Sequence, residues 1–170
     1  LKENSDDEEF AGGIVAILEI ATIENSKNTG NVIGSTNIGG IAGESKGTIT
    51  QCRNDGQVSK VAGVICKTVN LGGLVGKNGE AARLSNSKNY GNVNSETDTL
   101  VNLGGICGIL YNNSIVELCE NNGAISGSGK EIIPNEDTNT NCASCTSNNG
   151  GSASTDDFGQ LNIGIIYGKY

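Results

Sequence analysis

The sequence predicts an all-β fold, a β-solenoid (β-helix) of about four and a half coils with a period of about 32 residues. Three observations predict this fold: a Gly-Gly phrase that recurs along the chain, a second phrase at a fixed offset from it, and a composition that disfavours helices. Repeats of this length are typical of stacked arrays, in which each unit buries its apolar face on its neighbours.

The first phrase reads apolar-Gly-Gly-apolar. Its second glycines are separated by 27, 33 and 32 residues, and the equivalent position of a weaker fifth copy follows after 60. The copies are Ala11–Ile14, Ile38–Ile41, Leu71–Leu74, Leu103–Ile106 and, in weaker form, Ile163–Ile166.

The second phrase reads apolar-x-x-Ser/Cys-x-Asn-x-Gly-x-apolar, and its five positions match in four copies without a gap. Stacked copies would bring the asparagines into a column, where their amides can bond to one another along the axis. We expect the glycine to form a corner with positive φ. The copies begin at Ile23, Ile49, Leu84 and Val116, and their asparagines are Asn28, Asn54, Asn89 and Asn121. Another asparagine precedes the Gly-Gly phrase, at Asn37, Asn70, Asn102 and Asn162.

The composition agrees with short strands and tight turns. The chain has 26 glycines and 23 asparagines, both poor helix formers. With two Phe, four Tyr and no Trp or Met, the core must consist of Leu, Ile and Val together with small residues. The apolar run 14–23 could form a helix in isolation, but its alignment with the other copies predicts strand.

The repeats divide the chain as follows. An acidic lead-in is expected to be disordered or an interaction tail. A later stretch rich in Asn, Ser, Thr and Gly is expected to be a surface loop inserted into the solenoid. The predicted segments are the lead-in 1–9 and the solenoid domain 10–170, with coils at about 10–36, 37–69, 70–101 and 102–128, the insertion 129–160 and a half-coil 161–170.

The net charge of −8 argues against nucleic acid and anionic membranes as partners, because no basic patch is present to neutralise phosphates. No run of 18 apolar residues occurs, so we expect no membrane insertion. Because methionine is absent, the initiator included, we expect a processed or excised chain.

Two pairs among the six cysteines are informative. Cys52 and Cys119 hold the same repeat position two coils apart, so roughly 10 Å would separate them, too far for a disulfide. We interpret them as small buried apolar residues. Cys142 and Cys145 lie in the polar insertion and are the candidate disulfide. A zinc site is not expected, since the chain has no histidine and no second Cys-x-x-Cys.

The segments Gly39–Gly43, Gly72–Gly76 and Gly104–Gly108, each followed by the asparagine phrase, resemble the Glug repeat of large secreted and surface proteins. The resemblance covers residues 10–128 and 161–168. It implies an extracellular or cell-surface structural role, and the family has no catalytic residues that could be carried over. The first copy departs from the pattern at Ala16, and the fifth copy lacks the second phrase.

No catalytic site is evident. Without histidine, a Ser or Cys nucleophile has no ordinary base. Three carboxylate pairs could act on glycosides, but none recurs between copies, so we expect no enzyme and no cofactor. The alternative function is a carbohydrate-binding or carbohydrate-cleaving β-helix. The pairs are Glu117 with Glu120, Glu96 with Asp98, and Asp156 with Asp157.

The weak calcium candidates are Asp137, Asp156 and Asp157. A solvated loop is the favoured interpretation of these residues.

Two further sites concern the surface. Asn112 begins an N-glycosylation sequon, Asn112–Ser114. The half-coil 161–170 ends in mid-turn, so its apolar residues Ile163, Ile165 and Tyr167 could dock on the first coil of a neighbour and give head-to-tail assembly. A boundary within a larger surface protein is the competing interpretation. The sequence thus predicts a rigid, non-catalytic extracellular module for adhesion or filament assembly.

Overall fold

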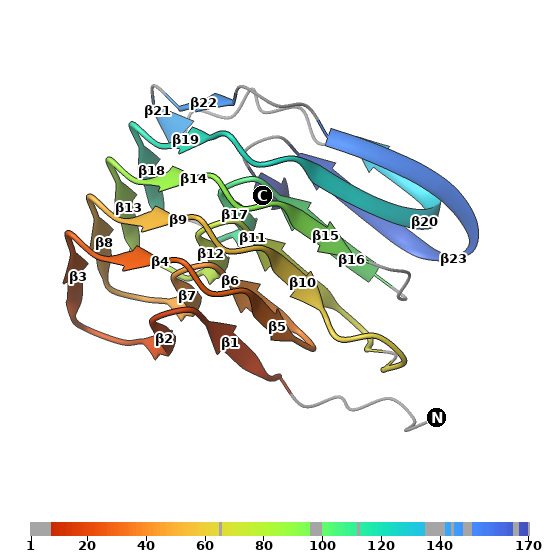
Figure 1. Cartoon of the computed structure of the whole chain (residues 1–170), viewed down its shortest axis with the longest axis horizontal. Helices are drawn as coiled ribbons and strands as arrows, with labels where there is room; N and C mark the ends of the chain where they lie inside the picture. The colour runs from red at the N-terminus through yellow and green to blue at the C-terminus, as the bar shows by residue number, and fades with distance from the viewer. Residues whose placement is uncertain are drawn as a thin grey trace.

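In the computed structural model the chain winds as a parallel β-solenoid, and the part of it that the structure describes contains no helix (Figure 1). The described residues are 8–64, 66–95, 100–111, 113–134, 142–143, 145–147, 151–164 and 167–169; the side chains of 128–134, 142–143, 147, 151–164 and 167–169 lie outside the description. Among the described strands every pairing is parallel, because each turn of the chain runs over the previous turn in the same direction. The predicted all-β solenoid is therefore confirmed.

Equivalent strands of successive turns stack into rows. Two rows hold the strands on either side of the Gly-Gly phrase. The first comprises β1 (Phe10–Gly12), β6 (Asn37–Gly39), β11 (Val69–Gly72), β16 (Leu100–Gly104) and part of β23 (Gly151–Gly164); the second comprises β2 (Val15–Leu18), β7 (Ala42–Ser45), β12 (Val75–Asn78), β17 (Cys107–Leu110) and β24 (Tyr167–Lys169).

Three more rows hold the asparagine phrase and the strand after it. The third comprises β3 (Thr22–Glu24), β8 (Thr48–Thr50), β13 (Arg83–Ser85), β18 (Ile115–Glu117) and β21 (Cys142–Ala143). The fourth comprises β4 (Lys27–Asn28), β9 (Arg53–Asn54), β14 (Lys88–Asn89), β19 (Glu120–Asn121) and β22 (Thr146–Ser147). The fifth comprises β5 (Val32–Gly34), β10 (Val58–Lys60), β15 (Val93–Ser95) and β20 (Ile125–Pro134). The long β20 and β23 pair with each other and join the first and fifth rows into one sheet.

The repeat sets the register. The residues after the glycine pair, Ile41, Leu74 and Ile106, are fully buried and lie in one column. The amide of Ile41 donates to the carbonyl of Leu74 at 2.8 Å, and that of Leu74 donates to Ile106 at 2.9 Å. In the weak fifth copy Gly164 lies opposite Gly104, so this copy continues the same register.

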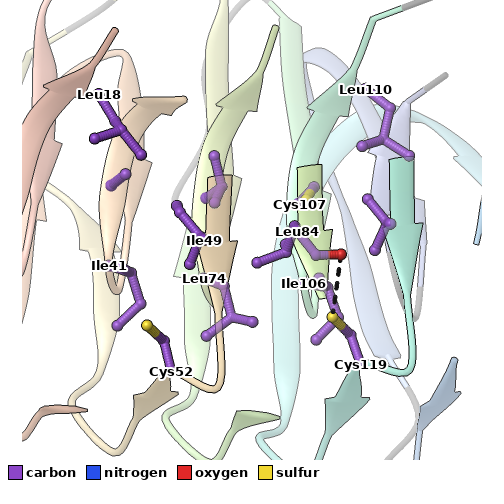
Figure 2. Close-up of a cluster of buried hydrophobic side chains, with 13 residues drawn as sticks. Leu18, Ile41, Ile49, Cys52, Leu74, Leu84, Ile106, Cys107, Leu110 and Cys119 are labelled. Carbon is purple, nitrogen blue, oxygen red and sulfur yellow. Dashed lines mark hydrogen bonds between the residues drawn. The ribbon is translucent and has the colours of Figure 1, made fainter. Parts of the chain in front are cut away.

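Each turn encloses two apolar cores. One lies between the second and third rows and contains the Ile41 column, Leu84 and three cysteines, Cys52, Cys107 and Cys119 (Figure 2). The other lies between the first and fifth rows and contains Ile38 and Val58 with their equivalents. Along the chain the Gly-Gly phrase separates Ile38 from Ile41, so it marks the passage from one core to the other. The asparagine of the second phrase marks the return passage.

These two passages contact each other. A Cβ built on Gly40 would lie 2.3 Å from the carbonyl oxygen of Gly73 and 2.3 Å from Cγ of Asn54. Gly13 and Gly73 meet Asn28 and Asn89 in the same way. The second glycine is therefore required because backbone and asparagine amide occupy the space of a side chain. The two phrases recur together because they pack on each other.

The predicted asparagine ladder is present. Nδ2 of Asn28 donates to Oδ1 of Asn54 at 2.9 Å, Asn54 donates to Asn89 at 2.9 Å, and Asn89 donates to Asn121 at 2.8 Å. Each Nδ2 also donates to the carbonyl two residues ahead, and each Oδ1 accepts the amide of that glycine. The buried side chains of this ladder thus find their hydrogen-bond partners in one another and in the glycine backbone.

A second ladder runs on the asparagines that precede the glycine pair. Nδ2 of Asn102 donates to Oδ1 of Asn70 at 2.6 Å, and Asn70 donates to Asn37 at 2.8 Å. Asn37 completes this ladder by donating to the carbonyl of Glu9 at 3.4 Å. Its donors point toward the N-terminal end of the stack, whereas those of the Asn28 ladder point away from it.

The predicted positive φ of the second-phrase glycine is wrong. In the described part Gly63 is the one glycine with positive φ, and the left-handed conformation falls instead on the residue before each Ser or Cys. The glycines are needed for close approach, because a Cβ on Gly91 would lie 1.8 Å from the carbonyl oxygen of Gly56. The left-handed residues are Asn25, Gln51, Asn86 and Leu118, with φ between 49° and 53°.

The structure also differs from the predicted surface loop at 129–160. Within it, Cys142 lies opposite Val116, and Ser147 lies opposite Asn121. These pairings place β21 and β22 over β18 and β19, the two strands that hold the second phrase in the fourth turn. The sequence pattern was hidden because Cys and Ser replace its apolar residue and its asparagine.

Candidate functional site

A pocket of about 280 Å³ opens beside the second row, where β7 and β12 end. It combines three charged side chains with one aromatic ring and a glycine. The lining residues are Glu44, Lys46, Gly79, Glu80 and Tyr111. Gly79 is held in place by its amide, which donates to the carbonyl of Ser45 at 2.8 Å.

Glu44 is the buried charge of this pocket, with only 5% of its surface exposed. Lys77, its neighbour in the next turn, approaches to 3.6 Å, and Lys46 to 3.9 Å. A buried carboxylate is tolerated only with such partners, because its desolvation cost is large. The two lysines supply these partners.

Lys77 connects the pocket with the N-terminal strand. Its Nζ lies 3.0 Å from Glu8, 6.0 Å from the ring centroid of Phe10 and 5.6 Å from that of Tyr111. Burial by itself would lower the pKa of Lys77, but the hydrogen bond to Glu8 and the charge of Glu44 outweigh it and raise the pKa above its ordinary value. The ammonium therefore remains charged throughout the neutral range.

Replacement of Lys77 by methionine tests this ion pair. We expect K77M to lower the free energy of unfolding by about 2 kcal/mol, because methionine keeps the apolar stem and leaves Glu44 with Lys46 alone. Urea denaturation at pH 7 measures the effect. The double variant E44Q/K77M should recover most of the loss, since no buried charge remains; equal stabilities of the single and double variants would contradict the assignment.

The carboxylate pair on β18 and β19 is engaged in ion pairs. Glu117 bonds to Arg83 of the previous turn, and Glu120 lies 2.9 Å from Lys88. Each carboxylate is thus paired with a cation across the stack, which is a structural arrangement. Glu96 and Asp98 lie outside the described residues.

The other predicted site residues fall as follows. Asp156 and Asp157 lie on β23, whose side chains are outside the description, and Asp137, Asn112 and Ile165 are outside the described residues. The backbone of Ile163 lies between Leu103 on one side and Pro134 on the other, and Tyr167 lies opposite Cys107. Of the three assembly candidates, Ile163 and Tyr167 therefore lie on the strands that cover β16 and β17.

The cysteines agree with the repeat. Cys52, Cys107 and Cys119 are buried free thiols, and Sγ of Cys119 contacts the carbonyl of Leu84 at 3.8 Å (Figure 2). Cys145 is disulfide-bonded. The side chain of Cys142 lies outside the description, so its pairing with Cys145 stays a prediction.

The buried thiols are expected to resist alkylation. Burial raises the pKa of Cys119 to about 12 and that of Cys107 well above its ordinary value. At pH 9 a thiol with that pKa is thiolate in only about one molecule in a thousand. We therefore expect iodoacetamide to leave Cys119 unlabelled at pH 9 in native protein and to label it in urea, as read by mass spectrometry. Rapid native labelling of Cys119 would contradict its burial.

The sequence did not identify Glu44, Lys77 and Tyr111 as a group. Glu44 and Lys77 hold the same position in successive Gly-Gly copies. An alignment of the repeats therefore shows opposite charges on neighbouring turns of one column. Tyr111 has no such signal, because it follows β17 at a turn. Its approach to Lys77 depends on the winding of the chain.

Within the described residues, no group of three or more metal-ligating side chains occurs, and no helix has the length and apolar character to cross a membrane. The parallel rows of strands and the repeat register define a parallel β-solenoid repeat protein. The chain matches no protein-family model, no curated protein and no solved structure.

Proposed function

We propose that this chain is a structural, non-catalytic module of an extracellular or cell-surface protein, whose rigid solenoid serves adhesion or head-to-tail assembly. The observation that carries the proposal is the pair of asparagine ladders running from turn to turn. In both ladders the repeated polar side chains bond to one another and are buried, so they stiffen the stack and are not presented to a substrate.

Two further properties support this role. The Glug-like phrases belong to the buried core and the passages between cores, which is where a structural repeat needs invariant small residues. The disulfide at Cys145 fits an oxidising compartment, as expected outside the cell.

Amide hydrogen exchange together with ligand screening tests the proposal. A rigid module should protect strand amides of all rows to a similar degree, because neighbouring turns open together. It should also give no saturable response in a calcium titration and no product from polysaccharides. Hydrolysis of a glycan, or protection limited to one or two rows, would contradict a purely structural role.

Carbohydrate binding is a second candidate, favoured by the pocket at Tyr111. An aromatic ring beside the carboxylates of Glu44 and Glu80 offers both an apolar face and hydrogen-bond acceptors, which suit a sugar ring. A glycan array is the test. Binding that is lost in Y111A and kept in Y90A would favour this candidate, since Tyr90 has a similar exposure and lies outside the pocket.

A further inference from the structure

One column of the stack holds a small residue with a hydroxyl or thiol group in each turn. The residues that follow its members along the chain are in register from the first turn to the fifth, so the members themselves lie over one another (Figure 1). Cys145 therefore lies over Cys119, and the amide of Thr146 donates to the carbonyl of Cys119 at 2.9 Å. The members of the column are Ser26, Cys52, Ser87, Cys119 and Cys145.

The two neighbouring cysteines differ in chemical state. Cys145 is disulfide-bonded, whereas Cys119 is a buried free thiol. The predicted partner of Cys145 is Cys142, since the other four of the six cysteines are free thiols. A free thiol thus lies one turn away from a disulfide.

The spacing and direction of the two side chains suit a disulfide. Neighbouring strands lie about 4.8 Å apart, within the range of about 4.4 to 6.8 Å for the Cα atoms of bonded cysteines. Side chains of this column reach toward the preceding turn, because the amide of Cys52 donates to Oγ of Ser87 at 3.0 Å and the backbone of Ser87 bonds to the thiol of Cys119. The same position directs Cys145 toward Cys119, and Cys145 packs on the apolar core that contains Cys119.

Among the described residues no other free thiol has this relation to Cys145. Cys66 lies in the other apolar core. Cys107 shares the core of Cys119 but lies on β17, in a different row. Cys52 is separated from Cys145 by two intervening turns. Cys119 is therefore the thiol that is placed to reach this disulfide.

We propose that Cys119 is a second disulfide partner of Cys145, and that exchange between the two partners latches the fifth turn to the fourth. The bond to Cys142 closes a short loop within one turn, whereas a bond to Cys119 joins two turns that are paired through β18 with β21 and β19 with β22. The longer enclosed loop restricts the unfolded chain more, so the latched form holds the fifth turn more firmly.

The exchange needs no oxidant. The thiolate sulfur of Cys119 attacks Sγ of Cys145, and the bond between Cys145 and Cys142 breaks. Cys142 leaves with the electron pair of that bond and takes up the proton that Cys119 lost, so one disulfide and one thiol are present before and after. Burial raises the pKa of Cys119 to about 12. Exchange is therefore slow in the closed stack and faster when the fifth turn opens.

Disulfide mapping by mass spectrometry tests the latch. Trypsin places Cys119 in peptide 89–130 and both Cys142 and Cys145 in peptide 131–169, so only the latch links the two peptides. Wild-type chain held in a buffer of reduced and oxidised glutathione should yield the linked pair. C142S treated with oxidised glutathione, which accepts the two electrons of the new bond, should yield at least about tenfold more of it than C119S/C142S.

The matched control is C107S/C142S, which removes the other thiol of peptide 89–130 and should keep the link. Circular dichroism checks that each variant folds. Absence of the linked pair from the wild-type chain would overturn the exchange whether or not C142S folds, and a link that needs Cys107 would overturn the role of Cys119. The inference goes beyond the proposed structural function and does not depend on it, because exchange protection and ligand screening test that function in either disulfide form.

Discussion

Gly91→Ala is expected to destabilise the protein by about 3 kcal/mol, a substantial part of the total free energy of unfolding of a typical domain. The added Cβ would lie 1.8 Å from the carbonyl oxygen of Gly56, which is held by strand pairing on both sides, and 2.9 Å from Nδ2 of Asn54. Neither neighbour can move without breaking ladder bonds. The free energy of unfolding from urea titration measures the effect.

Gly30→Ala is the matched control for this prediction. It makes the same chemical change at the same repeat position, but its Cβ meets nothing closer than 3.7 Å. Since Gly30 does not have a positive φ, alanine should fit and stabilise slightly, by about 0.5 kcal/mol, through the unfolded state. Similar losses at both positions would show that the carbonyl contact is not the cause.

Asn89→Ala is expected to cost about 3 to 5 kcal/mol. Asn89 is fully buried, donates to Gly91 and Asn121 and accepts from Gly91 and Asn54. Alanine would leave several buried polar groups without partners, each costing about 1 to 3 kcal/mol, and would add a cavity. The midpoint of urea denaturation should fall accordingly.

Asn92→Ala provides the comparison for the ladder variant. Asn92 also lies in the third turn, but its side chain is exposed and accepts one bond, from the amide of Ala124 at 3.0 Å. We expect a loss of about 0.5 to 1 kcal/mol, because water replaces the lost partner. If Asn89→Ala were no more costly than Asn92→Ala, the ladder would contribute little to stability.

Much of the fold was predictable because the repeat is written in adjacent residues. The offsets of Gly40 and Asn54 from their equivalents give the register, and the register brings like residues into columns. The asparagine ladder follows directly. The role assigned to Gly56 was wrong because a repeated glycine is expected both at a turn with positive φ and at a close backbone contact. The position of the Gly30 carbonyl oxygen shows that the second applies here.

The candidate site was less accessible from the sequence. The pocket requires Tyr111 of one turn to lie beside Lys77 of the previous turn and Glu44 of the turn before that. These residues belong to three turns and share no motif. Their contact depends on side-chain packing at a corner of the solenoid.

The sequence by itself determined the winding: a period close to 32 residues, small residues at fixed offsets and alternating apolar positions leave stacked parallel strands as the arrangement that satisfies the backbone. Only the tertiary structure decided that each turn holds two cores separated by glycine and asparagine, that β21 and β22 join the stack, and that Gly56 meets a carbonyl of the neighbouring turn. The physical reason is the sequence separation over which each feature is determined. Register follows from local repetition, whereas close approach and burial depend on which atoms of distant turns come to occupy the same space.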